Sequence, residues 1–319
     1  MPDASPRRPR AVVFAYHNVG VRCLRTLLAH GVDVPLVVTH DDVPGETIWF
    51  ASVAATAAEY AIPTIAPDDP NVGGVVDRVA TLAPDFLFSF YYRRMLQAAL
   101  LALPARGALN MHGSLLPKYR GRVPVNWAVL HGERATGATL HYMAEKPDSG
   151  DIVGQTAVPI LPDDTARDVF DKVTVAAELT LDAALPALLA GTAPRCRQDL
   201  AAGSYFGGRS PDDGVIDWNR DATTIHNLVR AVAPPFPGAF TAVGGHPARL
   251  LRTRVVDRTT PPTLAPTLGV DGAVLIAHCG GGGRVAILEL EIEGTAVDAA
   301  ELARRFGTAP LALGIGRTR

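Results

Sequence analysis

Residues Ala108 to Asp151 read ALNMHGSLLPKYRGRVPVNWAVLHGERATGATLHYMAEKPDSGD. The first five have the pattern of a buried β-strand, on which Asn110 and His112 project to one side and Met111 to the other. Open α/β sheets usually carry their chemistry at the carboxyl ends of the strands, where this pair is expected. An amide at that position can donate to a developing oxyanion, and an imidazole can donate or accept a proton near neutral pH.

A carboxylate is expected to complete this pair. The segment 135–143 alternates like a strand, which would return the chain to the same edge of the sheet and bring Asp148 there. A negative charge close to an imidazole favours its protonated form. We therefore predict Asn110, His112 and Asp148 as the catalytic residues of an acyl-transfer site. The N-x-H spacing by itself also suits residues that tie loops together around a packed histidine, and only the wider motif favours catalysis.

The chain before this stretch alternates between predicted strands and helices. Strands are expected at residues 11–15, 34–39, 62–65 and 86–90, and helices at 21–30, 52–60 and 72–82. This alternation predicts an α/β fold with a Rossmann-like, doubly wound and mostly parallel sheet. The first turn, AYHNVGVRC at residues 15–23, holds a single glycine where a dinucleotide-binding loop needs G-x-G-x-x-G, so NAD chemistry is not expected.

The remainder of the chain predicts a second, smaller domain. After strands at 135–143 and 152–158 and a long helix from 164 or 165 to about 189, residues 191–210 lose periodicity, which is typical of a linker. A helix at 222–230, short strands at 239–243, 248–256, 273–278 and 284–291, and a closing helix at 298–305 indicate a small β-barrel. The expected division is a disordered N-terminus at 1–9, a catalytic domain at 10–200, a linker at 201–213 that returns to the cleft, and a C-terminal domain at 214–319.

The composition limits which kinds of partner the protein is expected to have. The chain has 319 residues, is 48% hydrophobic and carries 30 basic against 32 acidic residues, so its net charge of −2 disfavours a nucleic-acid partner. Its cysteines, Cys23, Cys196 and Cys279, have neither metal-ligand nor disulfide-framework spacing, which indicates a reducing, cytoplasmic location and no metal site. No uncharged run approaches the ~18 residues of a membrane span, so no membrane insertion is expected. The oligomeric state is not specified by the sequence.

The motif HGSLLPKYRGRVPVNW at residues 112–127, followed by Asp148 and Ser149-Gly150, resembles the folate-dependent formyltransferases. That family includes methionyl-tRNA formyltransferase and glycinamide ribonucleotide formyltransferase. The resemblance is strongest to the formyltransferase domain of the bifunctional polymyxin-resistance protein that modifies UDP-4-amino-4-deoxy-L-arabinose. It also involves FAYHNVG (14–20), FSFYYRR (88–94), FGGRSPDD (206–213) and HNLVRAVAPPFPGAF (226–240), and it covers about residues 10–255.

This resemblance implies that the small barrel is an OB-like domain. The chain ends at Arg319 without the decarboxylating dehydrogenase domain of the bifunctional protein, so formyl transfer alone is expected.

The resemblance also implies the ligands and the residues that hold them. The one-carbon donor would be 10-formyltetrahydrofolate. Its binding residues would be Arg94, Met95 and Leu96, which hold the pterin largely through backbone groups, then Arg122, and a loop formed by Ala144, Glu145, Lys146, Pro147 and Asp148. The substrate-binding residues would be Tyr91, Tyr92 and Arg209, with Arg209 near the nucleotide. From the residues alone, a solvated turn at 91–94 and a solvated charge run at 118–122 are the simpler alternatives.

The expected reaction is attack of a primary amine on the formyl carbon. Asn110 and protonated His112 would stabilise the tetrahedral oxyanion, and His112 would give its proton to the departing N10. Asp148 would support the imidazolium and help to deprotonate the amine. Two other histidines are assigned no catalytic role: His141 is interpreted as packed or hydrogen-bonded in a strand, and His131 as a surface or capping residue.

Three functions stay open at this point. The first is N-formylation of a nucleotide-linked amino sugar, with UDP-4-amino-4-deoxy-L-arabinose as the specific expectation and another amino sugar or a natural-product amine as the nearest alternative. The second is methionyl-tRNA formylation, which would call for a basic insertion in the catalytic domain and a positive face on the second domain, and neither is evident. The third is a folate- or nucleotide-binding module without turnover, against which the intact catalytic side chains argue.

Overall fold

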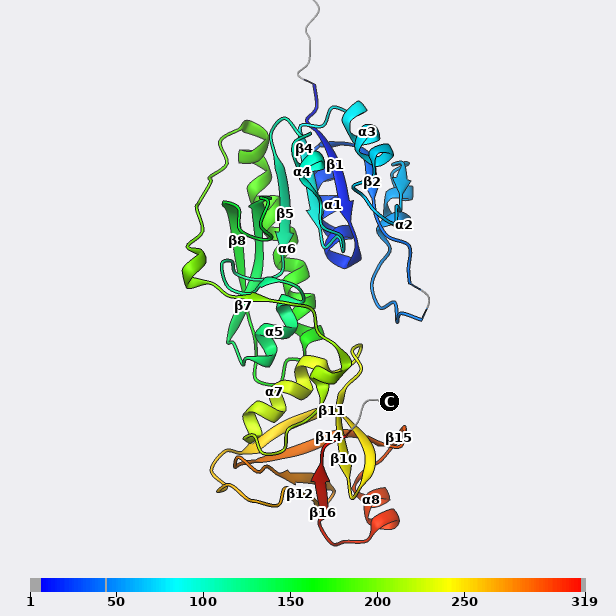
Figure 1. Ribbon diagram of the computed structural model, residues 1–319, viewed down its shortest axis with the longest axis vertical. Helices are drawn as coiled ribbons and strands as arrows, with labels where there is room; N and C mark the ends of the chain where they lie inside the picture. Colours follow the sequence, from blue (N-terminus) through cyan, green and yellow to red (C-terminus); the bar gives the residue numbers. More distant parts are fainter. Residues whose placement is uncertain (1–6, 44, 317–319) are drawn as a thin grey trace, which may run out of the picture. The chain divides into compact units, whose positions relative to one another are not determined.

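The computed structural model describes residues 7–43 and 45–316, which form two compact units (Figure 1). The first unit comprises the described residues up to Pro124 together with Thr136–Val158 and Asp171–Phe206. The second comprises Val125–Ala135, Pro159–Phe170 and the described chain from Gly207 onward. Residues 1–6 of the predicted disordered N-terminus lie outside the described part. Arg7, which follows them, donates to the Asp85 carboxylate at 2.9 and 3.0 Å.

A seven-stranded sheet forms the centre of the first unit. Its strands are β1 (Arg10–Ala15), β2 (Asp33–Val38), β3 (Thr64–Ile65), β4 (Phe86–Phe90), β5 (Ala108–His112), β7 (Ala135–Tyr142) and β8 (Ile152–Pro159), in the order β3–β2–β1–β4–β5–β7–β8. The strands from β3 to β5 pair in parallel, whereas β7 is antiparallel to β5. The predicted doubly wound, mostly parallel sheet is confirmed. Strand order reverses between β1 and β4, and ligands usually bind beyond the carboxyl ends of the strands at such a reversal.

Helices connect the strands of this sheet. They are α1 (His17–Ala29), α2 (Val53–Glu59), α3 (Gly73–Thr81), α4 (Ala98–Leu101), α5 (Pro124–Leu130) and α6 (Ala166–Ala190). The helix predicted over 52–60 corresponds to α2, and Ser52 caps its start, because its Oγ accepts from the Ala55 N–H at 3.2 Å. Between these helices the sheet is sealed from solvent, with Phe14, Leu87 and Phe88 fully buried. A rigid apolar sheet therefore carries the side chains at its carboxyl edge.

Helix α6 is the one helix in the described part of the chain that is long and apolar enough, by length and composition, to cross a membrane. Its apolar residues recur at helical spacing. Val173, Ala177, Leu181 and Leu185 on that face are fully buried within the fold. Packing of one face into the core accounts for the hydropathy of this helix.

A closed six-stranded barrel forms most of the second unit. Its elements are β10 (Ala239–Val243), β11 (His246–Asp257), β12 (Thr267–Asp271), β13 (Val274–His278), β14 (Arg284–Ile292) and β16 (Leu311–Gly314), with β15 (Thr295–Ala296) and the helices α7 (Ala222–Val232) and α8 (Ala299–Phe306). The order β11–β10–β16–β12–β13–β14 closes because β14 also pairs with β11. Trp218 lies in the core of this unit, where its Nε1–H donates to Thr241 Oγ1 at 2.7 Å. The predicted OB-like barrel is confirmed.

Several short elements are not predicted by the sequence. They include the barrel strands β12 and β16, the 3₁₀ turns η1 (Leu200–Ala202) and η2 (Pro211–Gly214), and the pair β6 (Arg120–Gly121) and β9 (Tyr205–Phe206). Strand β12 includes Gly and Asp, which are poor strand formers, and a two-residue strand shows no periodicity. The parallel β6–β9 pair has a structural consequence, because it ties part of the predicted linker to the loop that follows His112.

Candidate active site

The carboxyl end of β5 carries Asn110 and His112 on one face of the sheet. Antiparallel β7 runs beside it, and the register sets His141 opposite Asn110. The two histidines are almost fully buried, with 6% of His112 and 1% of His141 exposed, whereas Asn110 is half-buried. The two imidazoles are therefore fixed by packing, and part of the asparagine remains accessible.

Asp148 joins these side chains from the turn after β7. Its Oδ1 lies 3.5 Å from His112 Nδ1, 3.5 Å from His141 Nε2 and 3.5 Å from Asn110 Nδ2. Its Oδ2 accepts from the Gly121 N–H at 2.8 Å. Distances of 3.5 Å are long for hydrogen bonds, and such contacts often tighten only when a substrate is bound. The structure thus brings the three predicted catalytic residues together around one carboxylate oxygen.

Hydrogen bonding orients the ring of His112. Its Nε2 lies 2.8 Å from the Tyr119 carbonyl oxygen, and because a carbonyl can only accept, Nε2 must carry a proton. The other nitrogen, Nδ1, is then the atom that faces Asp148 and can gain or lose a proton. A proton at Nδ1 is stabilised by the adjacent carboxylate. Of the two ring nitrogens, Nδ1 is thus the one that faces the carboxylate.

His141 belongs to the same network. Its Nδ1–H donates to the Tyr142 carbonyl oxygen at 2.8 Å, so in the neutral ring Nε2 accepts from the Asn110 amide, 3.2 Å away. This contact fixes which way the Asn110 amide points. The prediction that His141 is packed and hydrogen-bonded is correct, but it misses that the partner is Asn110. Only the β5–β7 register, which single-sequence patterns do not reveal, identifies this contact.

Asp148 stays ionised at neutral pH. Burial raises the pKa of its carboxyl group, but the charge of neighbouring His112, the charge of His141 when that ring is protonated and the hydrogen bond from the Gly121 N–H outweigh burial and hold this pKa well below its usual range. A carboxylate with a fixed negative charge suits the support of an imidazolium, and it is a weak proton acceptor. Its predicted help in deprotonating the amine is correspondingly the weaker of its two predicted roles.

The turn after β4 packs directly against the residue that follows His112. Tyr91 adopts φ +57°, and a Cβ added to Gly113 would lie 1.9 Å from Tyr91 Oη. Gly113 is therefore needed so that the tyrosine ring can approach the backbone next to His112.

The rest of this turn is held by His40. Its ring stacks on Tyr92 with centroids 4.1 Å apart, and its Nε2 accepts from the Arg93 N–H at 3.0 Å. Burial and the positive charges of Arg93 and Arg94 lower the pKa of His40 to about 4, so the ring is neutral and keeps its acceptor. The predicted substrate residues Tyr91 and Tyr92 thus sit in a rigid turn.

The predicted folate-binding residues are mostly on the surface of the first unit. Arg94 and Met95 are exposed and Leu96 is buried, and the Met95 carbonyl accepts from Asn71 Nδ2 at 3.0 Å. Arg122 is exposed, and its N–H donates to the Phe206 carbonyl at 3.0 Å. In the predicted folate loop Ala144, Glu145 and Lys146 are exposed and Pro147 is half-buried. Their roles stay predictions.

Arg209 belongs to the second unit, whereas the predicted catalytic residues belong to the first. Its guanidinium is 4.9 Å from the centroid of the Trp127 ring and donates to the Asp213 carbonyl at 2.9 Å. These contacts give it a packed, partly shielded position on that unit. Its predicted role near the nucleotide remains a prediction.

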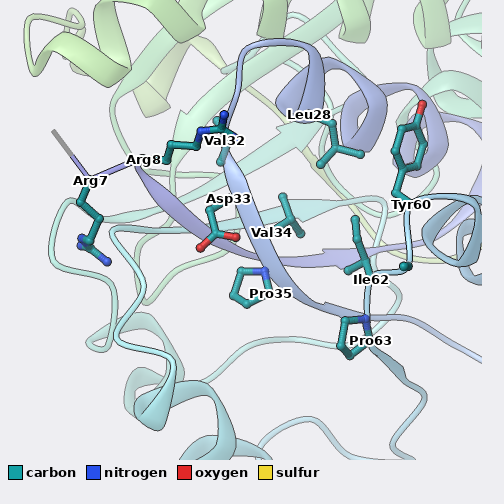
Figure 2. Close-up of a pocket in the computed structure, with 11 residues that line it drawn as sticks. Arg7, Arg8, Leu28, Val32, Asp33, Val34, Pro35, Tyr60, Ile62 and Pro63 are labelled. Carbon is teal, nitrogen blue, oxygen red and sulfur yellow. The ribbon is translucent and has the colours of Figure 1, made fainter. Parts of the chain in front are cut away.

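A cavity of about 510 Å³ lies elsewhere on the first unit (Figure 2). It is lined by residues around the start of β2, including Asp33 and Val34, by Leu28 of α1 and by Tyr60 and Ile62 after α2. The amino ends of parallel strands lie at the opposite edge of a sheet from their carboxyl ends. This cavity is therefore separate from the site around His112.

Two family matches cover most of the chain. The formyl transferase family matches residues 27–185, and the C-terminal domain family of the same enzymes matches residues 209–307. Similar solved structures include an N-formyltransferase from Helicobacter canadensis in complex with folinic acid and dTDP-3-aminofucose, with 19% identity, 88% of this chain and 99% of that chain covered and a TM-score of 0.69.

Two further structures show the range of enzymes that share the fold. WlaRD, a sugar 3N-formyl transferase determined in the presence of dTDP and 5-N-formyl-THF, has 17% identity, 92% and 98% coverage and a TM-score of 0.68. Glycinamide ribonucleotide transformylase 1 from Symbiobacterium toebii has 20% identity, covers 61% of this chain and 95% of its own, and has a TM-score of 0.53. With both family matches in sequence order on the sheet and the barrel that they describe, this chain belongs to the formyl transferase family.

Proposed function

We propose that this protein transfers the formyl group of 10-formyltetrahydrofolate to the primary amine of a nucleotide-linked amino sugar, with UDP-4-amino-4-deoxy-L-arabinose as the specific acceptor. The observation that carries the chemistry is the convergence of Asn110, His112 and Asp148 at the carboxyl edge of the sheet. An amide donor, a proton donor and a fixed negative charge are the groups that acyl transfer to an amine requires.

The reaction follows from the orientation of each group. The amine nitrogen forms a bond to the formyl carbon, and the carbonyl electron pair moves onto oxygen. The Asn110 amide and the proton on His112 Nδ1 donate to this oxyanion. When the bond from carbon to N10 breaks, the leaving nitrogen takes the Nδ1 proton. The surplus proton of the amine leaves to water or to the carboxylate, and Asp148 stabilises the imidazolium until its proton is used.

The coverage of the structural matches supports an amino-sugar acceptor. The N-formyltransferase in complex with dTDP-3-aminofucose and the sugar 3N-formyl transferase WlaRD align with 88% and 92% of this chain and with 99% and 98% of their own chains, so the match is nearly complete in both directions, whereas glycinamide ribonucleotide transformylase 1 aligns with 61% of this chain. The net charge of −2 argues against a tRNA acceptor. Resemblance of FSFYYRR (88–94) and FGGRSPDD (206–213) to the polymyxin-resistance domain favours the UDP-linked arabinose derivative.

The experiment is a competition among acceptors. Protein is incubated with 10-formyltetrahydrofolate labelled in the formyl group, and with UDP-4-amino-4-deoxy-L-arabinose, dTDP-linked amino sugars, glycinamide ribonucleotide or charged initiator tRNA. We expect label in the UDP-linked sugar with the highest kcat/KM. His112→Ala serves as the control for enzyme-independent formylation, and it should fold normally without transferring label.

The outcomes separate the parts of the proposal. Label in a different amino sugar would correct the acceptor and leave the chemistry intact. Label in tRNA alone would overturn the amino-sugar assignment. Equal transfer by the parental protein and His112→Ala would contradict the catalytic assignment itself.

A further inference from the structure

We propose that Gln198 is a positioning residue, which holds the Asp148 carboxylate in its working orientation. The inference rests on the proposed function, because it assigns to Gln198 a role in the same reaction. Gln198 comes from the segment 196–206, which we name the strap and which the sequence alone assigns to a linker and its surroundings. The strap and the catalytic turn both belong to the first unit.

Gln198 contacts the backbone on both sides of the catalytic turn. Its Nε2 donates to the Asp148 carbonyl at 3.0 Å and to the Gly150 carbonyl at 2.6 Å, which uses both amide hydrogens. The side chain is buried, and its Oε1 is shielded without a hydrogen-bond partner in the described part of the chain. Two hydrogen bonds from one buried, uncharged side chain thus hold the turn at two backbone positions.

The turn needs such a clamp. Asp148 adopts φ +52°, a left-handed conformation that is unfavourable for a non-glycine residue and persists only where the surroundings enforce it. Gly150 packs so closely that an added Cβ would lie 2.0 Å from the Tyr142 carbonyl. Without the two bonds from Gln198, these carbonyls would lose those donors and the turn could relax. The Asp148 side chain would then leave the histidines.

The strap also holds the loop that fixes His112. Cys196 exchanges two backbone hydrogen bonds with Ile152, at 2.8 and 2.9 Å, just beyond the catalytic turn. Farther along, the Ser204 N–H donates to the Pro117 carbonyl at 3.2 Å, and Ser204 Oγ accepts from the Tyr119 N–H at 2.9 Å. The Tyr119 carbonyl is the acceptor that orients His112. One segment therefore braces both halves of the site.

The carboxylate itself links the two halves. Asp148 Oδ2 accepts from the Gly121 N–H in β6, and β6 pairs with β9 of the strap. If Gln198 places Asp148, its loss must weaken this bond as well as the contact with His112. If Gln198 contributed only packing, its replacement would lower the stability of the protein without selectively weakening the hydrogen bond of the Gly121 N–H.

The test compares Gln198→Met with a matched control. Methionine keeps the length and the packing but removes both donors. Gln155→Met is the control, because Gln155 Nε2 also makes two hydrogen bonds in the first unit, to the Leu116 carbonyl and to Thr139 Oγ1 at 2.9 Å each, and it does not contact Asp148. Each variant is made alone and combined with Asp148→Asn, and kcat, KM and the melting temperature are measured.

Gln198→Met is expected to lower kcat by about 10- to 100-fold, the size of effect that small misplacements of a catalytic group produce, with little change in KM. Combined with Asp148→Asn it should cost nothing further, because the group it positions is already gone. Gln155→Met should lose comparable thermal stability but change kcat less than threefold. Full additivity of Gln198→Met with Asp148→Asn, or a kcat within twofold of the parent, would overturn the proposal.

A second measurement does not depend on turnover. Amide hydrogen exchange at Gly121 should accelerate about tenfold or more in Gln198→Met and in Asp148→Ala, since the hydrogen bond to the carboxylate is weakened in the first and lost in the second, and it should be unchanged in Gln155→Met. If no acceptor amine is found, the proposed function fails. The exchange measurement alone then tests whether Gln198 positions Asp148. If Gln198→Met does not fold, Gln198→Asn, one methylene shorter, is measured against the same criteria. Unchanged exchange at Gly121 would refute the inference.

Discussion

Replacement of Asp148 by asparagine tests the electrostatics of the site most sharply. The change removes the negative charge 3.5 Å from His112 Nδ1 and keeps the shape of the side chain and an acceptor for the Gly121 N–H. Both partners are buried, with 7% and 12% of their side chains exposed, so solvent screens the pair poorly. At an effective dielectric constant of about 20, two unit charges at that distance interact by about 5 kcal/mol.

Part of this energy is offset in the variant, because a neutral side chain is cheaper to bury than a carboxylate. We therefore expect kcat to fall by about 10²- to 10³-fold rather than by the full three to four decades that 5 kcal/mol would give. The KM for the folate donor should change little, since the charge acts on the proton at Nδ1 more than on binding.

The assay is single-turnover transfer of a labelled formyl group, measured from about pH 5.5 to 8.5. The pKa of Asp148 is held below its usual range, so the parental carboxylate is ionised throughout this interval and any pH dependence of the parental rate there comes from groups other than Asp148. A loss smaller than about tenfold at neutral pH would refute the reasoning.

Four further results are expected. Asn110→Ala should lose about 10²- to 10³-fold in kcat with the fold intact, because one oxyanion donor is removed; circular dichroism and steady-state kinetics check both points. His141→Ala should lower kcat by about tenfold, since the Asn110 amide loses the acceptor that orients it, and a kcat equal to that of the parent would remove His141 from the network. Gly113→Ala should unfold at lower temperature and lose activity, and Tyr91→Phe in the same chain should restore part of both, because the predicted clash is with Tyr91 Oη. The melting temperature of the parent should exceed that of Asp148→Asn above about pH 4 and approach it as pH falls further, since a carboxyl group whose pKa is depressed in the folded state stabilises the protein only above its unfolded pKa; a gap that widened in acid would contradict this.

The fold was predictable where a local pattern carried the information. The strands at Phe86–Phe90 and Ala239–Val243 have the bounds that the sequence predicts, since each is a short apolar run between clear turn signals. The helix predicted over 52–60 is likewise present, as α2 at Val53–Glu59. The β6–β9 pair was not, because its two strands are two residues each and lie far apart in the chain.

The site, too, was predictable only where the information is local in the sequence. The spacing of Asn110 and His112 on one strand is a local property, and it places both side chains on one face. The contact between Asn110 and His141 depends on strand register, and the contacts of Gln198 depend on how the segment after α6 returns to the catalytic turn. Neither produces a motif or a periodicity in the sequence. Long-range pairing is thus the information that patterns in one sequence lack.

The geometry of the formyl donor in the site is the most direct test of the account. A crystal structure with a stable 10-formyl folate analogue should place the formyl oxygen within about 3.2 Å of both Asn110 Nδ2 and His112 Nδ1, with Asp148 still beside the imidazole. A formyl group bound away from the carboxyl end of β5, or a formyl oxygen that meets neither donor, would contradict the central claim that these three residues carry out the transfer.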